Sequence, residues 1–265
     1  LITPKTKAIV VMHYAGIAND MNTILSITQK HNLFLIEDAA QAINNYYIQN
    51  GKKIPLGGIG HLSTISFHET KNIISGEGGL LIINDERFEK RAEIIWEKGT
   101  NRAAFFRGEV DKYGWVDIGS SFLPSELTAA FLYAQLEHLD DIHQRRLFLW
   151  NRYYEGLKIL EEKGYARLPY IPPYSTNNGH IFYLVCNSLE ERTALIQHLK
   201  SKGIMAVFHY QSLHKSPFYR DKHDGRELPN ADMFSDCLVR LPLYYNLIED
   251  DQLFVIESVL EFYKK

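Results

Sequence analysis

Short apolar runs separated by amphipathic stretches fill the first hundred residues. Runs of this length predict strands buried on both faces, and apolar residues three and four apart predict helices. Asp20 is placed to cap the first helix, which we expect to end near His31. The expected strands span residues 7–14, 33–36, 63–67 and 79–83, with helices at 20–31 and 85–98 and an exposed turn at 46–56. This alternation predicts an α/β sandwich with a largely parallel sheet and helices on both faces.

The second half of the chain follows a different pattern. Residues 100–124 carry little periodicity, so we expect a long loop, and its aromatic residues favour a functional role. Helical periodicity then runs from Ser125 to about residue 163, which predicts two helices or one bent helix. A strand at 180–186, a helix opened by a capping box at Ser188, a strand at 205–209 and a helix at 250–263 follow. We therefore expect a large domain over residues 1–160, with a linking helix, and a smaller α+β domain over residues 161–265.

Composition indicates the class of protein but not its chemistry. Hydrophobic residues make up 45% of the 265 residues and charged residues 23%, which is typical of a globular protein with its own core. The formal net charge of −3 gives no general attraction to nucleic acid or to an anionic membrane. No apolar stretch approaches the roughly 20 residues of a membrane span. Cys186 and Cys237 are too few for a disulfide framework or a zinc site, and we expect buried free thiols.

Four side chains fall where an open α/β sheet usually binds its ligand, after the carboxyl ends of strands. Asp38 ends one buried strand and Gln41 follows it. Ser66 ends the next expected strand but one, and Lys71 comes five residues later, before a glycine-rich turn. Such a lysine is a candidate Schiff-base former, and a buried acid opposite it suits a pyridinium nitrogen. From spacing alone a structural explanation stays open, in which Asp38 caps a helix and Lys71 is solvated on a loop.

The residue strings around these positions resemble those of one enzyme family. Residues 36–41 read IEDAAQ, residues 66–72 read SFHETKN and residues 76–79 read GEGG. Their order and spacing are similar to the cofactor site of the DegT/DnrJ/EryC1/StrS pyridoxal-phosphate sugar aminotransferases. The resemblance covers nearly the whole chain and implies the fold-type I architecture of pyridoxal-phosphate-dependent transferases. Residues 100–121 and 208–217 look like the branch that makes dTDP-4-amino-4,6-dideoxygalactose.

The resemblance implies a role for each candidate residue. Lys71 would hold pyridoxal 5'-phosphate as a Schiff base, release it to the amine donor, and then shuttle the proton between the donor carbon and the cofactor, with pyridoxamine 5'-phosphate as the intermediate form. Asp38 would keep the pyridine nitrogen protonated, while Gln41 would contact the 3-hydroxyl side of the ring and Ser66 the phosphate. Where the family commonly has Gly-x-Asn-x-Arg, this chain has GSSFL at 119–123. Ser121 would replace the Asn that reaches the neighbouring subunit's phosphate site, whereas the charge of the Arg is lost.

The implied reaction moves an amino group, from glutamate, onto C4 of a dTDP-4-keto-6-deoxyhexose. The resemblance further implies a homodimer that works in the cytoplasm, and neither nucleic acid nor membrane is an expected partner. Arg102 and Arg107 lie in the long loop and are candidates for binding a substrate pyrophosphate. His209, Tyr210 and His214 fall where relatives approach the sugar, and no carboxylate or cysteine nearby completes a metal site with them.

Two further features leave alternatives open. His13, at the end of the first strand, is either a residue of the site or a structural histidine. The glycines of 57–60 precede a strand instead of following one, which is wrong for a dinucleotide fingerprint. The glycines of 76–79 lack the Lys-Ser/Thr of a nucleotide loop. Neither glycine run therefore predicts a phosphate-binding loop on its own.

Family members carry a further N-terminal segment, which supplies cofactor contacts and sheet strands. If the polypeptide starts at Leu1, we expect an unpaired sheet edge and weak cofactor retention. The alternative to an enzyme is then a truncated, non-catalytic fragment that keeps only dimer or sugar-nucleotide contacts. A related sugar dehydratase is disfavoured, because relatives of that kind replace the Schiff-base lysine with His and this chain has Lys71.

Overall fold

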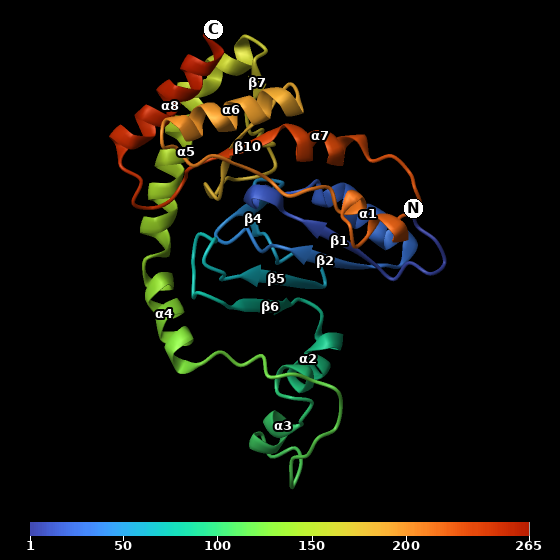
Figure 1. The fold of residues 1–265 in the computed structure, drawn as a ribbon. Helices are drawn as coiled ribbons and strands as arrows, with labels where there is room; N and C mark the ends of the chain where they lie inside the picture. The colour runs from blue at the N-terminus through green and yellow to red at the C-terminus, as the bar shows by residue number, and fades with distance from the viewer. Residues whose placement is uncertain (265) are drawn as a thin grey trace. The chain divides into compact units, whose positions relative to one another are not determined.

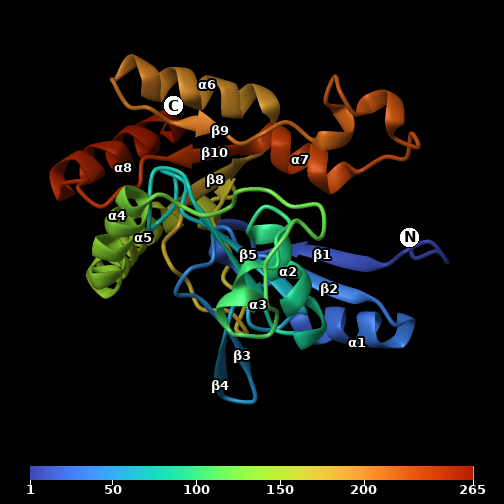
Figure 2. The same ribbon diagram turned by 90° about the horizontal axis from the view of Figure 1, so that it is seen from below.

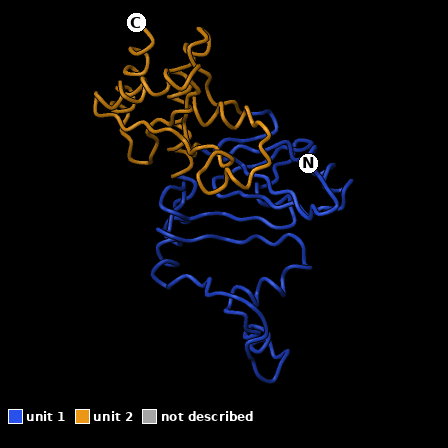
Figure 3. Tube along the Cα trace, turned by 45° about the vertical axis from the view of Figure 1, so that its right-hand side comes forward, with its two compact units in different colours: residues 1–141, 172–178 blue, residues 142–171, 179–265 orange. Residues whose placement is uncertain are grey.

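The computed structural model describes residues 1–264, which divide into two compact units. Unit 1 comprises residues 1–141 and 172–178, and unit 2 comprises residues 142–171 and the described residues from 179 onward (Figure 3). The short segment 172–178 therefore belongs with unit 1, although its neighbours in the sequence belong with unit 2. The domain boundary expected near residue 160 stays a prediction.

Unit 1 is built around a mixed sheet. Its strands are β1 (Ala8–Met12), β2 (Phe34–Asp38), β3 (Tyr46–Gln49), β4 (Lys52–Pro55), β5 (Leu62–Ser66) and β6 (Gly79–Ile83). Among the described residues the sheet has the order β1-β2-β5-β6 (Figure 1). β1, β2 and β5 run parallel, and β6 pairs antiparallel with β5. The largely parallel sheet of an α/β fold is therefore confirmed.

A hairpin leaves the sheet between β2 and β5. β3 and β4 pair with each other and project from unit 1 (Figure 2), and Tyr47 of β3 makes an isolated bridge to Ser175. Asn50 and Gly51 form the turn with φ values of 50° and 75°, because a tight hairpin needs left-handed residues at both central positions. Since the hairpin takes no place in the sheet, β2 pairs directly with β5, and Asp38 lies opposite Thr64.

Two helices of unit 1 begin at side-chain caps, and the sequence predicts the one at Asp20. The Asp20 carboxylate accepts a hydrogen bond from the backbone N–H of Thr23 at 3.1 Å and opens α1, and Ser125 caps α4 through Thr128 at 3.2 Å. The α-helices are α1 (Met21–His31), α2 (Glu89–Trp96), α3 (Arg102–Phe106) and α4 (Glu126–Glu137), and the 3-10 turns are Tyr14–Gly16 and Glu86–Phe88. Apart from α3, the segment between α2 and α4 is irregular, as expected.

The long helical run is two helices, as one of the two expectations had it. α4 ends at Glu137, and α5 (Leu139–Glu162) begins after His138. Most of α5 belongs to unit 2. In the part of the chain that the structure describes, no helix combines the length and the apolar character needed to cross a membrane.

Unit 2 is an α+β unit with an antiparallel sheet. Its strands are β7 (Ala166–Arg167), β8 (Phe182–Cys186), β9 (Val207–Phe208) and β10 (Leu238–Leu241), in the order β7-β8-β10-β9. Its further helices are α6 (Leu189–Ser201), α7 (Pro229–Cys237) and α8 (Glu249–Tyr263), with 3-10 turns at Leu213–Lys215 and Arg220–Lys222. The Ser188 hydroxyl accepts the Glu191 N–H at 3.1 Å, which confirms the predicted cap of α6.

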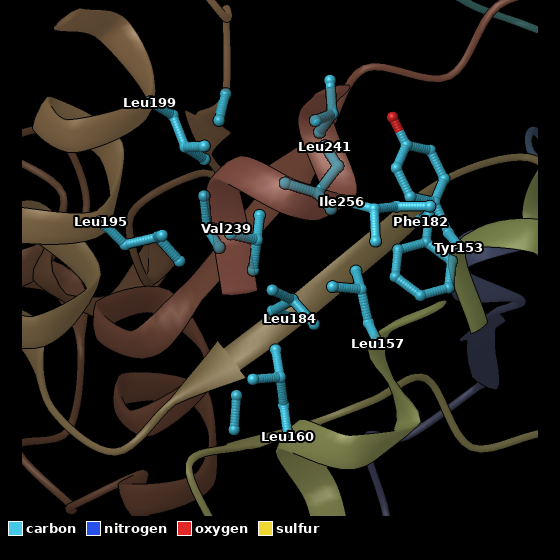
Figure 4. Close-up of a cluster of buried hydrophobic side chains, with 14 of the residues drawn as sticks. Tyr153, Leu157, Leu160, Phe182, Leu184, Leu195, Leu199, Val239, Leu241 and Ile256 are labelled. Atoms are coloured by element: carbon cyan, nitrogen blue, oxygen red, sulfur yellow. The ribbon is translucent and has the colours of Figure 1, made fainter. Parts of the chain in front are cut away.

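Apolar side chains from the sheet and helices of unit 2 form its core. Leu157 of α5, Leu184 of β8, Leu195 of α6 and Val239 of β10 are completely buried in one cluster (Figure 4). Each such side chain contributes roughly 1.5–3 kcal/mol on removal from water. Cys186 and Cys237 are buried free thiols, as predicted.

The core of unit 1 lies between its sheet and α1. Met21 of α1 and Leu35 of β2 are completely buried and pack in one cluster with Val11, Tyr47 and Leu56. The cluster includes side chains of β1 and β2, and polar residues follow at the carboxyl ends of these strands. Those polar residues form the candidate site.

Candidate active site

Two neighbouring strands of unit 1 end side by side and carry the candidate residues. Asp38 is the last residue of β2, and Ser66 is the last residue of β5, two positions beyond the partner of Asp38. The sequence separates these strands by a hairpin, but the sheet makes them adjacent. Because parallel strands present their carboxyl ends at one edge, Asp38, Gln41, Ser66 and the loop that carries Lys71 all leave the same edge of the sheet.

The half-buried Asp38 is held by its backbone and by one carboxylate oxygen. Its carbonyl accepts the backbone N–H of His13 at 3.0 Å, and its Oδ1 accepts the backbone N–H of Ala40 at 3.1 Å. The next amide, of Ala39, donates to the Thr64 carbonyl of β5 at 2.9 Å. Among residues 1–264, no hydrogen bond is made to Oδ2. One oxygen therefore fixes the rotamer while the other stays available to a ligand.

Lys71 follows β5 and is half-buried. Burial lowers the pKa of its ammonium group below the ordinary value, and the negative charge of Asp38 opposes this shift without cancelling it. The two groups are thus close enough to interact, as the sequence predicts. A lowered pKa makes more of the neutral amine available, which is the form that attacks a carbonyl carbon.

The loop between β5 and β6 holds Lys71 through its neighbours. Ile73 is completely buried, and the Asn72 side chain donates to the Asn178 carbonyl at 2.9 Å. The loop closes through the Glu69 amide, which donates to the Gly76 carbonyl at 3.0 Å. Gly76 has a φ of 80°, a left-handed conformation that glycine adopts without strain. Anchors on both sides of Lys71 limit where its amine can reach.

Gln41 is bound to the turn that follows β1. Its Oε1 accepts the backbone N–H of Ala15 at 2.7 Å, and its carbonyl accepts the Asn178 side-chain amide at 2.8 Å. Asn178 is completely buried and comes from the 172–178 segment. The amide group of Gln41 has no hydrogen-bond partner within residues 1–264. The side chain therefore offers a donor to a ligand, and its contact with a cofactor ring stays a prediction.

Ser66 presents its hydroxyl at the end of β5. The oxygen accepts the backbone N–H of His68 at 3.3 Å. The hydroxyl hydrogen is then free to rotate toward an acceptor, such as a phosphate oxygen. This geometry suits the predicted role without testing it.

The remaining candidates of unit 1 lie in the segment beyond α2, which Figure 1 draws away from the strands. Arg102 forms an ion pair with Glu97 at 2.6 Å, and Arg107 pairs with Glu93 at 2.6 Å and Glu109 at 2.7 Å. Ser121 is exposed and pairs with Glu97 in an isolated bridge. The structure does not bring these three candidates together with the Asp38 cluster, and both guanidinium groups already have carboxylate partners.

His209, Tyr210 and His214 belong to unit 2. The His209 and Tyr210 rings contact each other with centroids 4.6 Å apart, and Tyr210 is 78% exposed. The nearly buried His214 pairs with Asp232 at 3.2 Å. Among residues 1–264, no three side chains of the metal-binding types gather into a cluster. Contact of these residues with a sugar stays a prediction.

Glu37 has a structural role that the sequence motifs did not predict. This carboxylate is completely buried and accepts hydrogen bonds from His13 Nε2 at 2.9 Å and from the amides of Gly57, Ile59 and Gly60 at 2.5–2.9 Å. Burial, the largest influence, would raise the pKa of Glu37, but these hydrogen bonds together lower it below the ordinary value. His13 is therefore a structural histidine, and the 57–60 amides bind an internal carboxylate.

One sequence signal pointed to Glu37. A charged residue within a strand buried on both faces must find partners, because an unpaired buried carboxylate is strongly destabilising. The run IED therefore implies a partner for Glu37 as much as a role for Asp38. Sequence spacing gives no sign that a glycine turn twenty residues later supplies that partner.

The residues at the strand ends fit pyridoxal 5'-phosphate. A half-buried amine with a lowered pKa, a carboxylate with one uncommitted oxygen, a side-chain amide donor and a hydroxyl lie at one edge of the sheet. The amine suits the aldehyde of the cofactor, and the carboxylate suits its pyridine nitrogen. The amide donor suits its ring oxygen, and the hydroxyl suits its phosphate.

Comparisons with known proteins agree with this chemistry. The family model described as the DegT/DnrJ/EryC1/StrS aminotransferase family matches residues 1–260. The spore coat polysaccharide biosynthesis protein SpsC of Bacillus subtilis is 31% identical over 99% of this chain and 68% of its own length. The chain thus spans about two thirds of that relative.

Solved structures show the same relationship. DesV of S. venezuelae, solved in complex with a ketimine intermediate, is 30% identical with a TM-score of 0.86, over 100% of this chain and 67% of its own. Spr1654 of Streptococcus pneumoniae, solved in a PLP form, shares the fold with 23% identity and a TM-score of 0.85, over 99% of this chain and 70% of its own. The chain therefore belongs to the DegT/DnrJ/EryC1/StrS aminotransferase family, whose members are pyridoxal-phosphate-dependent transferases that act on sugars.

Proposed function

We propose that the protein transfers an amino group from glutamate to C4 of a dTDP-4-keto-6-deoxyhexose. The observation that carries the proposal is the convergence of Lys71 and Asp38 at the carboxyl edge of the β2–β5 pair, with burial lowering the lysine pKa. The sugar class rests on the family, and the dTDP-linked 4-keto sugar rests on the resemblance of residues 100–121 and 208–217 to one branch of it.

The chain's own residues would divide the work. The bound cofactor would supply an electron sink for the electron pair that is left when a proton leaves the donor carbon. The Lys71 amine would hold the cofactor covalently and then, once released, carry that proton between carbon atoms as a general base and acid. The Oδ2 of Asp38 would accept a hydrogen bond from the ring nitrogen and keep it protonated, since a carboxylate favours the charged form of its partner.

Gln41 and Ser66 would orient the cofactor. The free amide of Gln41 would donate to the ring oxygen, and the Ser66 hydroxyl would donate to the phosphate. Both side chains are already fixed by one backbone amide each, so little rotamer freedom is lost on binding. Ser121 would add a hydrogen bond to the phosphate in the neighbouring subunit's site.

Substrate contacts would come from the segment beyond α2 and from unit 2. A pyrophosphate would have to compete with the buried Glu97 for Arg102, and with Glu93 and Glu109 for Arg107; both arginine side chains are 46% exposed. His209, Tyr210 and His214 would contact the sugar. We propose that these sites are completed in a cytoplasmic homodimer.

Exposed apolar side chains support the proposed homodimer. Trp115, Ile118 and Leu127 are 80–85% exposed, and Phe131 of α4 is 50% exposed. All four lie within residues 115–131, and exposed apolar side chains that gather in one region generally mark an interaction site. Sedimentation of the wild type, compared with a Leu127→Lys variant, tests this part of the proposal. We expect a dimer that the variant weakens, and a monomeric wild type would contradict it.

Covalent trapping tests the proposed chemistry. Pyridoxal phosphate is added to the wild type, to Lys71→Ala and to the control Lys52→Ala, an exposed lysine of the β3–β4 hairpin. In the wild type and in the control only, we expect a visible absorbance band from the bound cofactor. Borohydride should then reduce the Schiff base to a stable adduct on Lys71. Amino transfer from glutamate is then measured with dTDP-linked 4-keto sugars and with UDP-linked counterparts. A trapped cofactor without transfer to the dTDP sugars would overturn the substrate assignment alone.

A further inference from the structure

The buried pair His13–Glu37 touches the backbone of Asp38. Glu37 and Asp38 are consecutive in β2, so their side chains point to opposite faces of the sheet. The Glu37 side chain is anchored on one face, and the backbone amide of His13 donates to the Asp38 carbonyl at 3.0 Å. Any loosening of Glu37 or His13 therefore reaches the residue that is proposed to hold the cofactor ring.

The hydrogen bonds around Glu37 use every acceptor position that its geometry offers. Oε2 accepts from His13 Nε2 and the Gly57 amide, both at 2.9 Å, and Oε1 accepts from the amides of Ile59 at 2.8 Å and Gly60 at 2.5 Å. The Ser63 hydroxyl donates to the Glu37 carbonyl at 2.9 Å. Four donors directed at a buried carboxylate fix both its position and its ionised state.

The histidine is oriented by its second nitrogen. His13 Nδ1 accepts the backbone N–H of Asn19 at 3.4 Å, so the proton of the neutral ring is on Nε2 and points at Glu37. His13 and Glu37 are both completely buried. The pair therefore ties β1 to β2 at the end of the sheet where the candidate site begins.

The turn at residues 57–60 is shaped around this carboxylate. A Cβ on Gly60 would lie 2.9 Å from the Leu35 carbonyl and 3.3 Å from the Glu37 Cγ, so only glycine fits there. Gly57 has a φ of 95°, which side chains other than that of glycine rarely allow. The Asn84 side chain donates to the carbonyls of Gly57 and Gly60 at 2.9 and 2.8 Å and so closes the turn from outside.

We propose that His13, Glu37 and the 57–60 amides form a positioning device that sets the Asp38 carboxylate for the cofactor's ring nitrogen. The inference rests on the proposed function. Neither His13 nor Glu37 reaches the cofactor, because their side chains are enclosed by protein. Their effect would be transmitted through the β1–β2 backbone, and it is distinct from the effect of general stability on the site.

Two variants and a control test the device. His13→Leu removes one of the four donors, and Glu37→Gln turns one acceptor oxygen into a donor. Met21→Ala, in the unit 1 core, serves as a control that destabilises the same unit without touching the pair. For each folded protein, the dissociation constant for pyridoxal phosphate and the wavelength and pH midpoint of the bound-cofactor band are measured, with unfolding midpoints recorded alongside.

We expect both pair variants to raise the dissociation constant by about tenfold or more and to shift the band or its pH midpoint. Met21→Ala should leave all three quantities within about twofold of wild type despite a lower unfolding midpoint. Values for the pair variants equal to those of the control would overturn the inference. If Glu37→Gln does not fold, His13→Leu decides the question. Absence of any trapped band in the wild type would instead refute the proposed function.

Discussion

Replacing Glu37 with Gln should destabilise unit 1 strongly for a change of a single atom. Gln keeps the size of the side chain but turns one acceptor oxygen into an NH2 group. Each Glu37 oxygen accepts two buried N–H groups, so two donors lose their acceptor whichever way the amide is turned. A buried donor without an acceptor costs about 1–3 kcal/mol.

Part of this loss is offset because the variant no longer buries a charge. The expected net change is about 2–4 kcal/mol at pH 7, a large part of the roughly 5–15 kcal/mol that stabilises an average protein. Urea unfolding followed by circular dichroism, with linear extrapolation, measures it. A loss below about 1 kcal/mol would refute the hydrogen-bond argument, because it would mean that the four donors find other partners.

The pH dependence has a definite sign. The pKa of Glu37 is lowered in the folded protein, so its stabilisation is fully present above its unfolded value of 4.5 and is lost as the pH falls through the folded value. The stability difference between wild type and Glu37→Gln should therefore shrink as the pH falls below about 4.5. A stability difference between the two proteins that stays constant down to pH 3 would contradict the lowered pKa of Glu37.

Asp85 provides a matched control for this titration. Its pKa is lowered to about 2, first of all by the hydrogen bond from Arg87, but the Arg87 side chain is 63% exposed. Solvent screens exposed ion pairs, so Asp85→Asn should change stability far less than Glu37→Gln. Equal losses of stability in both variants would show that burial of the carboxylate does not determine the size of the loss.

Three further changes probe the site and the cores. Because burial lowers the Lys71 pKa and Asp38 raises it, the amine should react with an amine-specific reagent at a lower pH than exposed lysines do, and Asp38→Asn should lower that pH further; an increase would contradict the assigned contact. Gly16→Ala should destabilise unit 1 and weaken cofactor binding, because Gly16 has a φ of 80° and no room for a Cβ; unchanged unfolding and binding would refute this. Tyr153→Phe should cost about 1–2 kcal/mol in urea unfolding, because it removes the 2.8 Å hydrogen bond from the Tyr153 hydroxyl to the Pro242 carbonyl; a neutral effect would mean that water replaces the hydroxyl.

Local signals in the sequence predicted the elements well. Asp20 and Ser188 each supply the predicted cap, since capping depends only on residues three positions away. The predicted turn at Asn50 follows from the same short-range chemistry. These features could be read before any tertiary contact was known.

Tertiary contacts could not be predicted in this way. That β2 pairs directly with β5, past a hairpin, depends on how the hairpin leaves the sheet. The contacts of Gln41 with Asn178 and of Glu37 with the 57–60 turn join residues 20 to 137 positions apart. Periodicity carries no information over such distances, so the sequence predicted the site's reactive residues but not the groups that hold them.

Selective reaction of pyridoxal phosphate with Lys71 tests the central claim most directly. Wild type, Lys71→Ala and Lys52→Ala are incubated with pyridoxal phosphate and borohydride, and the modified peptide is identified by mass spectrometry. The account predicts one reduced adduct, on Lys71, in the wild type and in Lys52→Ala, and none in Lys71→Ala. A folded wild type that forms no adduct at Lys71, or forms it equally on exposed lysines, would contradict the account.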